Sequence, residues 1–264
     1  MFDIGVNLTN SQLVEDVSGV LDRAGAAGVI GIAVTGTSVS DSRLAVELCN
    51  RYQPVFPGVL CATAGVHPHH ASEWNEDARQ QLLALAQEPA VRAIGETGLD
   101  FNRNFSTPAE QIEAFKAQLE IAAATGLPLF LHEREAFATQ IGLLHDYRDH
   151  ISGAVAHCFT GNREQLQAYL ELDFYIGITG WVCDERRGQE LASLVPQIPL
   201  ERLLIETDAP WLLPRNIHPR PGKRINEPAF LGWISREVAR LCNRNELEIR
   251  ERTLQNALNF FQIS

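Results

Sequence analysis

The segment Gly95-Glu-Thr-Gly-Leu-Asp100, which follows the apolar run 91–94, decides the fold that this sequence predicts. A short apolar run next to glycine is typical of a buried strand, so Glu96 should lie where that strand ends. Three later apolar runs end in the same way, each close to a side chain that can bind a metal: His132, His157 and Asp208. One such side chain is more often a solvated or structural group, but four at equivalent positions indicate one shared site.

Apolar runs alternate with helical patterns along the chain. The runs expected as strands cover residues 2–7, 29–34, 59–66, 91–94, 127–132, 153–157, 174–178 and 203–206. Helices are expected at residues 11–27, 40–52, 75–87, 107–126, 135–147, 163–170, 185–195, 229–242 and 245–261. This alternation predicts an α/β protein made of a single TIM (β/α)₈ barrel domain over residues 1–264. In that fold the chemistry lies at the carboxyl ends of the strands.

The composition is that of a globular protein with a large core, because 45% of the 264 residues are hydrophobic and 21% are charged. The five cysteines are scattered and form no C-x-x-C pair, which argues against a disulfide framework and fits a reducing compartment. The start of the chain does not resemble a signal peptide, and no apolar stretch approaches the roughly 20 residues that cross a bilayer. We therefore expect a cytoplasmic protein that does not bind membranes.

The net charge of −11 argues against a broad basic surface that would wrap around nucleic acid. A phosphodiester substrate remains compatible with this charge if bound cations and a few arginines make one cleft positive.

The four strand-end side chains Glu96, His132, His157 and Asp208 combine imidazole with carboxylate and include no thiolate. Such a donor set suits Mg²⁺, Mn²⁺ or Zn²⁺, and a divalent cation can activate water as a nucleophile. A purely structural metal site is the alternative, although such sites usually complete their coordination with protein ligands.

Several basic and aromatic side chains follow the predicted strand ends. Guanidinium and ammonium groups there could bind phosphate oxygens, although each alone is more often a solvated charge. The segment 215–224 stands apart because it is basic, lacks acidic residues and follows the eighth strand, where barrels often bind phosphate. Aromatic rings could stack on bases or simply pack against the fold. The basic candidates are Arg103, Arg134, Arg163, Arg215, Lys223 and Arg224, and the aromatic ones are Phe101, Trp181 and Trp211.

Five motifs together resemble the TatD family of metal-dependent nucleases, and the resemblance runs from end to end of the chain. It implies a TIM-barrel hydrolase that uses a divalent metal, most commonly Mg²⁺, with Mn²⁺ and Zn²⁺ as alternatives. It also implies 3′ to 5′ cleavage of single-stranded DNA, with RNA as a further substrate. The motifs are Gly65-Val-His67-Pro-His69, Gly95-Glu-Thr-Gly-Leu-Asp100, His157-Cys-Phe-Thr-Gly161, Glu206-Thr-Asp208-Ala-Pro210 and Asn226-Glu-Pro228.

The resemblance also implies roles for single residues. Glu96 matches a carboxylate that can bridge two metals, and Asp208 matches the last-strand ligand or base, so both are expected to be catalytic. Glu96, His132, His157 and Asp208 form the expected metal set. The expected substrate-binding set is His67, His69, Arg103, Arg134, Arg215, Lys223 and Arg224.

One departure concerns the first strand. Many relatives begin with Asp-x-His-x-His, whereas this chain has Gly5 and Asn7 in place of the histidines. The loss of two nitrogen donors predicts one well-formed metal site, with a second metal bound only alongside substrate phosphate.

The rival functions are a metal-dependent barrel hydrolase of small esters, lactones or amides, and a catalytically silent barrel used for interaction. The nuclease reading includes a role in DNA repair or nucleic-acid turnover, and we expect a monomer.

Overall fold

Eight parallel strands form one sheet whose order follows the chain, and they confirm the predicted TIM barrel. This computed structural model describes residues 1–222 and 224–263. The ring closes where Val6 bridges Ala209 in parallel fashion and the Asp208 N–H donates to the Gly5 carbonyl at 2.9 Å. The strands are β1 (Phe2–Val6), β2 (Gly31–Val34), β3 (Val59–Ala64), β4 (Val91–Asp100), β5 (Leu129–Arg134), β6 (Ala154–Ala156), β7 (Tyr175–Ile178) and β8 (Leu203–Ile205).

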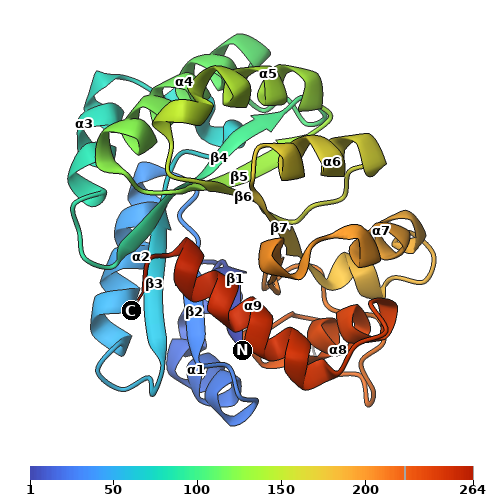
Figure 1. Cartoon of the computed structure of the whole chain (residues 1–264). Helices are drawn as coiled ribbons and strands as arrows, with labels where there is room; N and C mark the ends of the chain where they lie inside the picture. Colours follow the sequence, from blue (N-terminus) through green and yellow to red (C-terminus); the bar gives the residue numbers. More distant parts are fainter. Residues whose placement is uncertain (223, 264) are drawn as a thin grey trace.

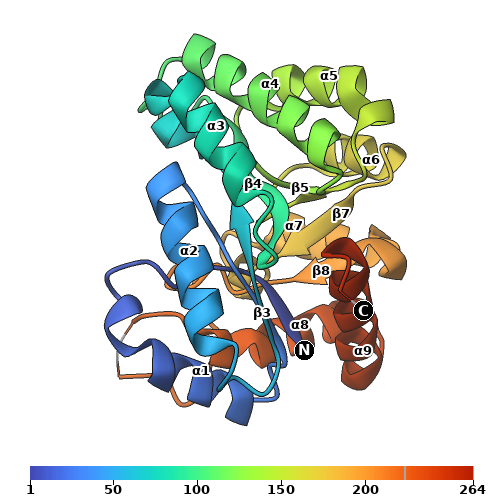
Figure 2. The ribbon, with the colours of Figure 1, turned by 90° about the vertical axis from the view of Figure 1, so that its left-hand side faces the viewer.

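Helices surround the strands, as Figure 1 shows, and Figure 2 shows three of them, α1 to α3, outside the strands on one side. The α-helices are α1 (Val17–Ala26), α2 (Val39–Tyr52), α3 (Glu76–Leu85), α4 (Pro108–Thr125), α5 (Phe137–Tyr147), α6 (Arg163–Glu171), α7 (Gln189–Leu194), α8 (Leu231–Leu241) and α9 (Glu246–Phe260). Among the described residues, no helix is both long enough and apolar enough to span a membrane.

Local hydrogen bonds explain where the helices begin and end. Thr107 and Glu110 form a capping box at the start of α4, and Gly126 ends that helix at a φ of 73°. The first helix begins later than predicted because the Asp16 carboxylate caps it by accepting the Gly19 N–H. The predicted helix 185–195 begins only at Gln189, the first residue of α7, since the Asp184 carboxylate accepts backbone N–H groups in the preceding turn.

Two apolar clusters fill the molecule. The larger one lies between the strands and the surrounding helices. The smaller one lies inside the barrel at the amino ends of the strands, where Phe2 stacks on Phe261 with ring centroids 5.4 Å apart. This plug, contributed partly by α9, fills the floor of the barrel, and polar side chains gather at the opposite end.

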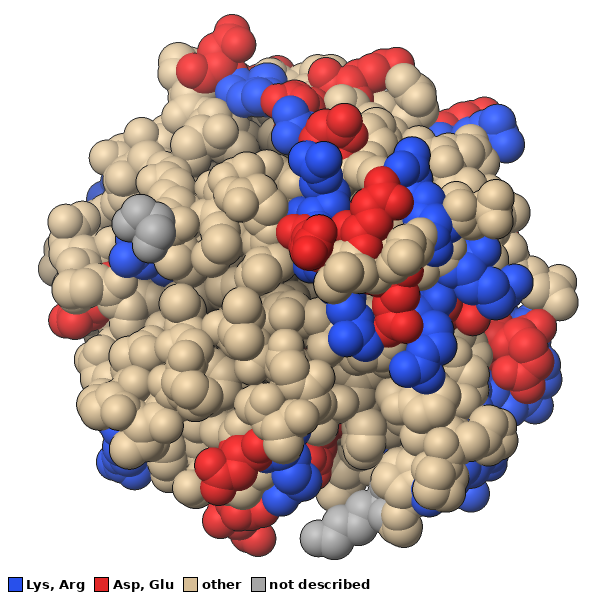
Figure 3. All heavy atoms as spheres, turned by 60° about the horizontal axis from the view of Figure 1, so that its bottom comes forward, with Lys and Arg blue, Asp and Glu red and all other residues tan. Residues whose placement is uncertain are grey.

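The surface in Figure 3 carries arginine and lysine side chains next to acidic ones. Ion pairs on α8 and at the start of α9 illustrate this mixing: Arg240 lies 2.6 Å from Glu237, and Arg244 lies 2.6 Å from Glu248. The arginines of these pairs therefore have acidic partners that balance their charge.

Candidate active site

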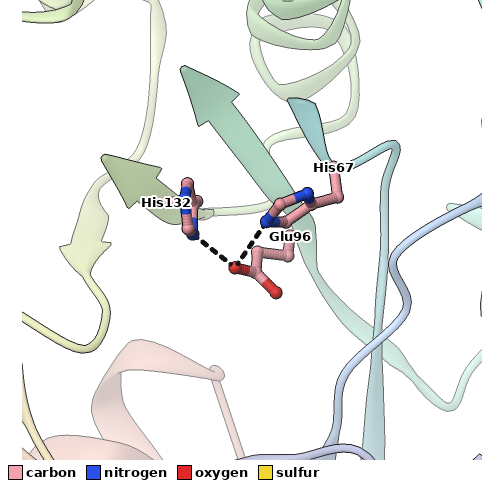
Figure 4. Close-up of side chains that lie close together, drawn as sticks. All are labelled: His67, Glu96 and His132. Atoms are coloured by element: carbon pink, nitrogen blue, oxygen red, sulfur yellow. Dashed lines mark hydrogen bonds and ion pairs between the residues drawn. The ribbon is translucent and has the colours of Figure 1, made fainter. Parts of the chain in front are cut away.

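Three imidazoles converge on one oxygen of Glu96 at the mouth of the barrel. Glu96 Oε1 lies 2.9 Å from His132 Nδ1, 3.0 Å from His157 Nε2 and 3.4 Å from His67 Nε2. The four residues lie on or just after four successive strands, β3 to β6. Glu96 lies inside β4, which continues to Asp100, so the prediction that this strand ends before Glu96 is wrong. Figure 4 shows His67 and His132 both directed at the Glu96 carboxylate. Ligand atoms of these three residues all lie within 4.8 Å of one another, so they could share a metal ion.

Without a metal, the imidazoles of this cluster differ in protonation: against the effect of burial, nearby carboxylates raise the pKa values of His132 and His157, whereas His67 behaves in the opposite way. Burial lowers the pKa of His67 to about 4, so its imidazole is neutral at pH 7. Burial alone would raise the pKa of Glu96, but His157, His67 and His132 together hold that pKa well below its usual range. The buried Nε2 of His132 lies 3.5 Å from Asp100 and has no hydrogen-bond partner among the described residues. A neutral imidazole, a carboxylate and an unpartnered ring nitrogen are suitable ligands for a divalent cation.

Glu206 is a residue without a predicted role, and it orients His157 from the side away from Glu96. Its fully buried carboxylate lies 3.0 Å from His157 Nδ1 and accepts the Cys158 N–H at 2.6 Å. A Cβ atom at Gly177 would lie 2.6 Å from Glu206 Oε1, and one at Gly5 would overlap Oε2. The two glycines therefore make room for a carboxylate that fixes the ring with Nε2 toward Glu96.

Asp100 is a second residue without a predicted role. Its carboxylate lies 2.8 Å from His69 Nε2, and only 1% of the residue is exposed. The same carboxylate accepts the backbone N–H groups of Asn102 and Arg103 at 3.0 Å each. Asp100 thus ties the loop after β4 to the imidazole cluster.

Strand-end position would have identified both residues. Glu206 directly follows β8, and Asp100 is the last residue of β4. In each motif another acidic residue nearby, Asp208 or Glu96, received the assignment instead.

Asp208 lies on the cavity wall, outside the compact group of His67, Glu96 and His132. Its carboxylate accepts a hydrogen bond from the Asn7 side chain at 3.1 Å. Burial, together with the negative charges of Glu96 and Glu206 and against the influence of His157, raises the pKa of Asp208 to about 7.

A cavity of about 800 Å³ opens above the imidazole cluster. Two predicted substrate-binding arginines, Arg103 and Arg134, line it together with His67 and His69. Arg187 also lines it, and this residue was not predicted; its guanidinium carbon lies 6.0 Å from the Trp181 ring centroid.

The other predicted basic residues lie elsewhere. Arg163, Arg215 and Arg224 lie outside the cavity lining, and Lys223 falls outside the described residues. Arg215 lies 3.7 Å from Asp184 and 3.4 Å from Glu185, so nearby acids already partner it.

The aromatic candidates divide into two kinds. Phe101 and Trp181 are partly buried against the core, although Trp181 also borders the cavity. Trp211 lines the cavity with 49% of its surface exposed. Cys158 is not suited to nucleophilic attack, because burial raises the pKa of its thiol far above neutral.

Comparisons with known proteins agree with this geometry. The family model described as TatD related DNase matches residues 2–262. A protein of Edwardsiella piscicida named 3'-5' ssDNA/RNA exonuclease TatD is 52% identical, with 100% of both chains covered. A protein of the same name from Salmonella typhimurium is 51% identical, covering 100% of this chain and 99% of that one.

Among solved structures, a TatD family hydrolase from Entamoeba histolytica superimposes with a TM-score of 0.91 and 28% identity, covering 98% of this chain and 97% of that one. The TatD homolog YJJV from Escherichia coli k12 has a TM-score of 0.88 and 26% identity, covering 100% of this chain and 98% of that one.

Proposed function

Since the chain belongs to the TatD-related DNase family, we propose that it is a metal-dependent exonuclease that removes nucleotides from the 3′ end of single-stranded DNA and RNA. The observation that carries this proposal is the convergence of three imidazoles on Glu96 beneath an open cavity with arginines in its lining. The relatives that are 52% and 51% identical over essentially their full lengths carry this activity in their names.

Glu96, His132, His157 and Asp208 are proposed to hold the metal, with His67 as a further ligand beside Glu96 and His132. Mg²⁺ is the proposed metal, and Mn²⁺ and Zn²⁺ are the alternatives that the imidazoles favour. When bound, a divalent cation would neutralise phosphate charge and make a water molecule more acidic.

The protein groups would position the reactants. Glu96 supplies the fixed negative charge at the centre of the site. Glu206 keeps the His157 ring turned so that Nε2 faces Glu96. Asp208, held by Asn7, is the proposed proton acceptor for the attacking water. Arg103 and Arg134 would bind the phosphates of the strand as it enters the cavity.

We also propose that the protein acts as a monomer in the cytoplasm, in DNA repair or nucleic-acid turnover. The residues proposed for the site all lie within one barrel, so a monomer would suffice for the reaction. The five cysteines are all free, which supports a reducing compartment. Size-exclusion chromatography with light scattering would measure the mass; a stable dimer would contradict the first point.

The decisive experiment uses protein stripped of metal with a chelator. 5′-labelled single-stranded and duplex oligonucleotides are incubated with it after Mg²⁺, Mn²⁺ or Zn²⁺ is added. We expect a ladder that shortens from the 3′ end, faster on the single strand, and no reaction without metal. Glu96→Gln should slow the reaction by at least about a hundredfold, since it removes the central charge at unchanged size. An undegraded oligonucleotide under every metal condition would refute the proposal.

A further inference from the structure

Phe105 is an aromatic side chain that the fold leaves in solvent at the rim of the site. Its exposed fraction is 69%, whereas Phe101 in the same loop packs against the core. A single exposed hydrophobic residue is common and by itself needs no explanation. Phe105 differs from the others because of how its loop is held and what its ring contacts.

The backbone around Phe105 is fixed on both sides. The Ser106 hydroxyl donates to the His69 carbonyl at 3.2 Å and accepts the Ser72 N–H at 3.0 Å, and Ser106 is 2% exposed. The Asn104 side chain donates to a backbone carbonyl of the same loop at 2.6 Å. The ring is therefore presented by an ordered loop, which lowers the entropy lost when a ligand binds to it.

The ring lies next to the imidazole cluster. Phe105 meets His69 edge to face, with centroids 4.8 Å apart and an interplanar angle of 78°. His69 lines the cavity and lies 2.8 Å from Asp100, which also approaches His132. Arg103, two residues earlier in the same loop, lines the cavity as well. One loop thus carries an exposed aromatic ring that contacts His69 and a guanidinium that lines the cavity.

We propose that Phe105 is a stacking platform for one nucleobase of a single-stranded substrate, while Arg103 binds a neighbouring phosphate. This inference rests on the proposed function and adds to it the way in which the strand is held. Base stacking on an aromatic ring is tolerant of sequence, because every base has a π face. In a duplex those faces already stack on neighbouring bases, so this contact selects unpaired strands.

Trp211 offers a comparison on the other side of the mouth. It follows β8, and Phe105 follows β4, four strands away in a ring of eight. The loops that carry the two exposed rings therefore leave opposite sides of the barrel mouth, and bases that contact the rings must differ in position along the strand.

The test combines protein variants with abasic substrates. Binding of fluorescent single-stranded oligonucleotides is measured by anisotropy in chelator, and 3′ degradation is measured separately with metal. We expect Phe105→Ala to raise the Kd by about tenfold for oligonucleotides of any sequence. Phe105→Trp should bind like the wild type. Phe105→Leu, which keeps apolar bulk against His69 but has no ring, should bind like Phe105→Ala.

Abasic residues placed one at a time from the 3′ end identify the stacked base. At one position, the abasic residue should weaken binding to the wild type about as much as the Phe105→Ala substitution does. The same abasic residue should cause no further loss of binding in the Phe105→Ala variant. In the Trp211→Ala variant, the abasic residue that causes no further loss of binding should stand at a different position of the oligonucleotide.

Val55→Ala is the matched control, because Val55 is 73% exposed and precedes β3 at the floor end of the barrel. Binding by Val55→Ala should match the wild type. The inference is overturned if Phe105→Leu binds like the wild type, if Val55→Ala is as weak as Phe105→Ala, or if abasic effects are unchanged in Phe105→Ala. A wild-type protein that degrades no oligonucleotide would instead refute the proposed exonuclease.

Discussion

At the scale of single residues, His157 shows how the site divides its work between two carboxylates. Glu96 faces the cavity, and Glu206 lies behind the ring and is fully buried. Burial alone would lower the pKa of His157, but Glu206 and Glu96 raise it well above its usual value. The ring is therefore held in one orientation even without a metal ion.

Glu206→Gln should weaken metal binding and slow turnover by about ten- to a hundredfold, the range typical of groups that orient a metal ligand. Unlike the carboxylate, the glutamine amide has an NH2 group in place of one acceptor oxygen. The amide would therefore hold His157 Nδ1 less firmly, and the ring would lose its fixed orientation. Isothermal titration with Mn²⁺ and the rate of oligonucleotide cleavage measure the two effects. Glu201→Gln, at an exposed position before β8, is the control; equal metal affinity in both variants would argue against the orienting role.

Asp3 is a buried residue whose charge state should make stability depend on pH. Its carboxylate is fully buried, and it accepts the Thr207 backbone N–H at 2.8 Å and the Thr207 hydroxyl at 2.6 Å. Burial raises its pKa to about 8, from the ordinary value of 3.8. Between these two pH values, Asp3 keeps its proton in the folded protein but has lost it in the unfolded chain. The contribution of Asp3 to the unfolding free energy is therefore full below about pH 4 and is lost as the pH rises to 8.

Asp3→Asn should remove that loss, because asparagine is neutral and can still accept the Thr207 N–H. We compare the unfolding free energy of the Asp3→Asn variant with that of the wild type. The difference, variant minus wild type, should increase between pH 4 and pH 8 by at least about 1.4 kcal/mol, the equivalent of one pKa unit. Urea denaturation in chelator across this range measures it. Asp22→Asn, at an exposed site on α1, should show a flat difference; a flat difference for Asp3→Asn as well would contradict the prediction.

At the scale of elements, the end of β1 and the residue after β8 pack against each other inside the barrel. Gly5 on β1 leaves the space that Glu206 occupies just after β8, and a Cβ at Gly5 would also lie 3.1 Å from the Phe130 ring. The Glu206 carboxylate therefore occupies the space that a side chain at position 5 would need.

Gly5→Ala should lower the unfolding free energy by about 1–3 kcal/mol, as overpacking of a core typically does. Replacing Gly5 and Asn7 together with histidine should lower the melting temperature further, without adding a second metal. Gly142→Ala, where an added Cβ meets no atom within 4 Å on α5, should be neutral or stabilising. Thermal melts and metal content per chain distinguish the outcomes, and a stable double histidine variant with extra metal would show that Glu206 can move aside.

Arg103, in the loop after β4, and Arg134, at the end of β5, are the arginines most clearly placed for phosphate. Replacing both Arg103 and Arg134 with alanine should weaken binding of single strands of every sequence alike. If each arginine neutralises one phosphate, the slope of log K against log salt should shrink by about 1.4. The control removes the same charge from α8 through Arg236→Ala and Arg240→Ala, whose side chains pair with glutamates. If the slope of log K against log salt shrinks equally in both double variants, net charge alone accounts for the effect, and the two cavity arginines have no special role in phosphate binding.

At the scale of the whole molecule, the sequence predicted the barrel because every strand and helix has its own local signal. Apolar runs mark the strands, and capping residues such as Thr107 mark helix starts. The prediction failed at boundaries where a side chain competes for backbone N–H groups, as Asp184 does before α7.

The strand-end rule also selected Glu96, His132 and His157, which the structure brings together, since barrel topology brings strand ends together. His67 was predicted to bind substrate, but its ring lies beside Glu96 and His132. It did not find the contacts that depend on three-dimensional packing. The position of Glu206 at a strand end singles it out, but its role behind His157 becomes clear only from the space left by Gly5 and Gly177. Phe105 is recognisable only when the loop that presents it is known.

The bridge between Val6 and Ala209 has a consequence for synthesis of the chain on the ribosome. β1 is made first, yet its partner at the closing seam appears about 200 residues later. At about 5–20 residues per second, β1 keeps one open edge for roughly 10–40 s, and an open edge can pair with other chains. The nascent protein is thus most exposed to aggregation before the seam closes, and it cannot cut nucleic acid until Glu206 and Asp208 have emerged.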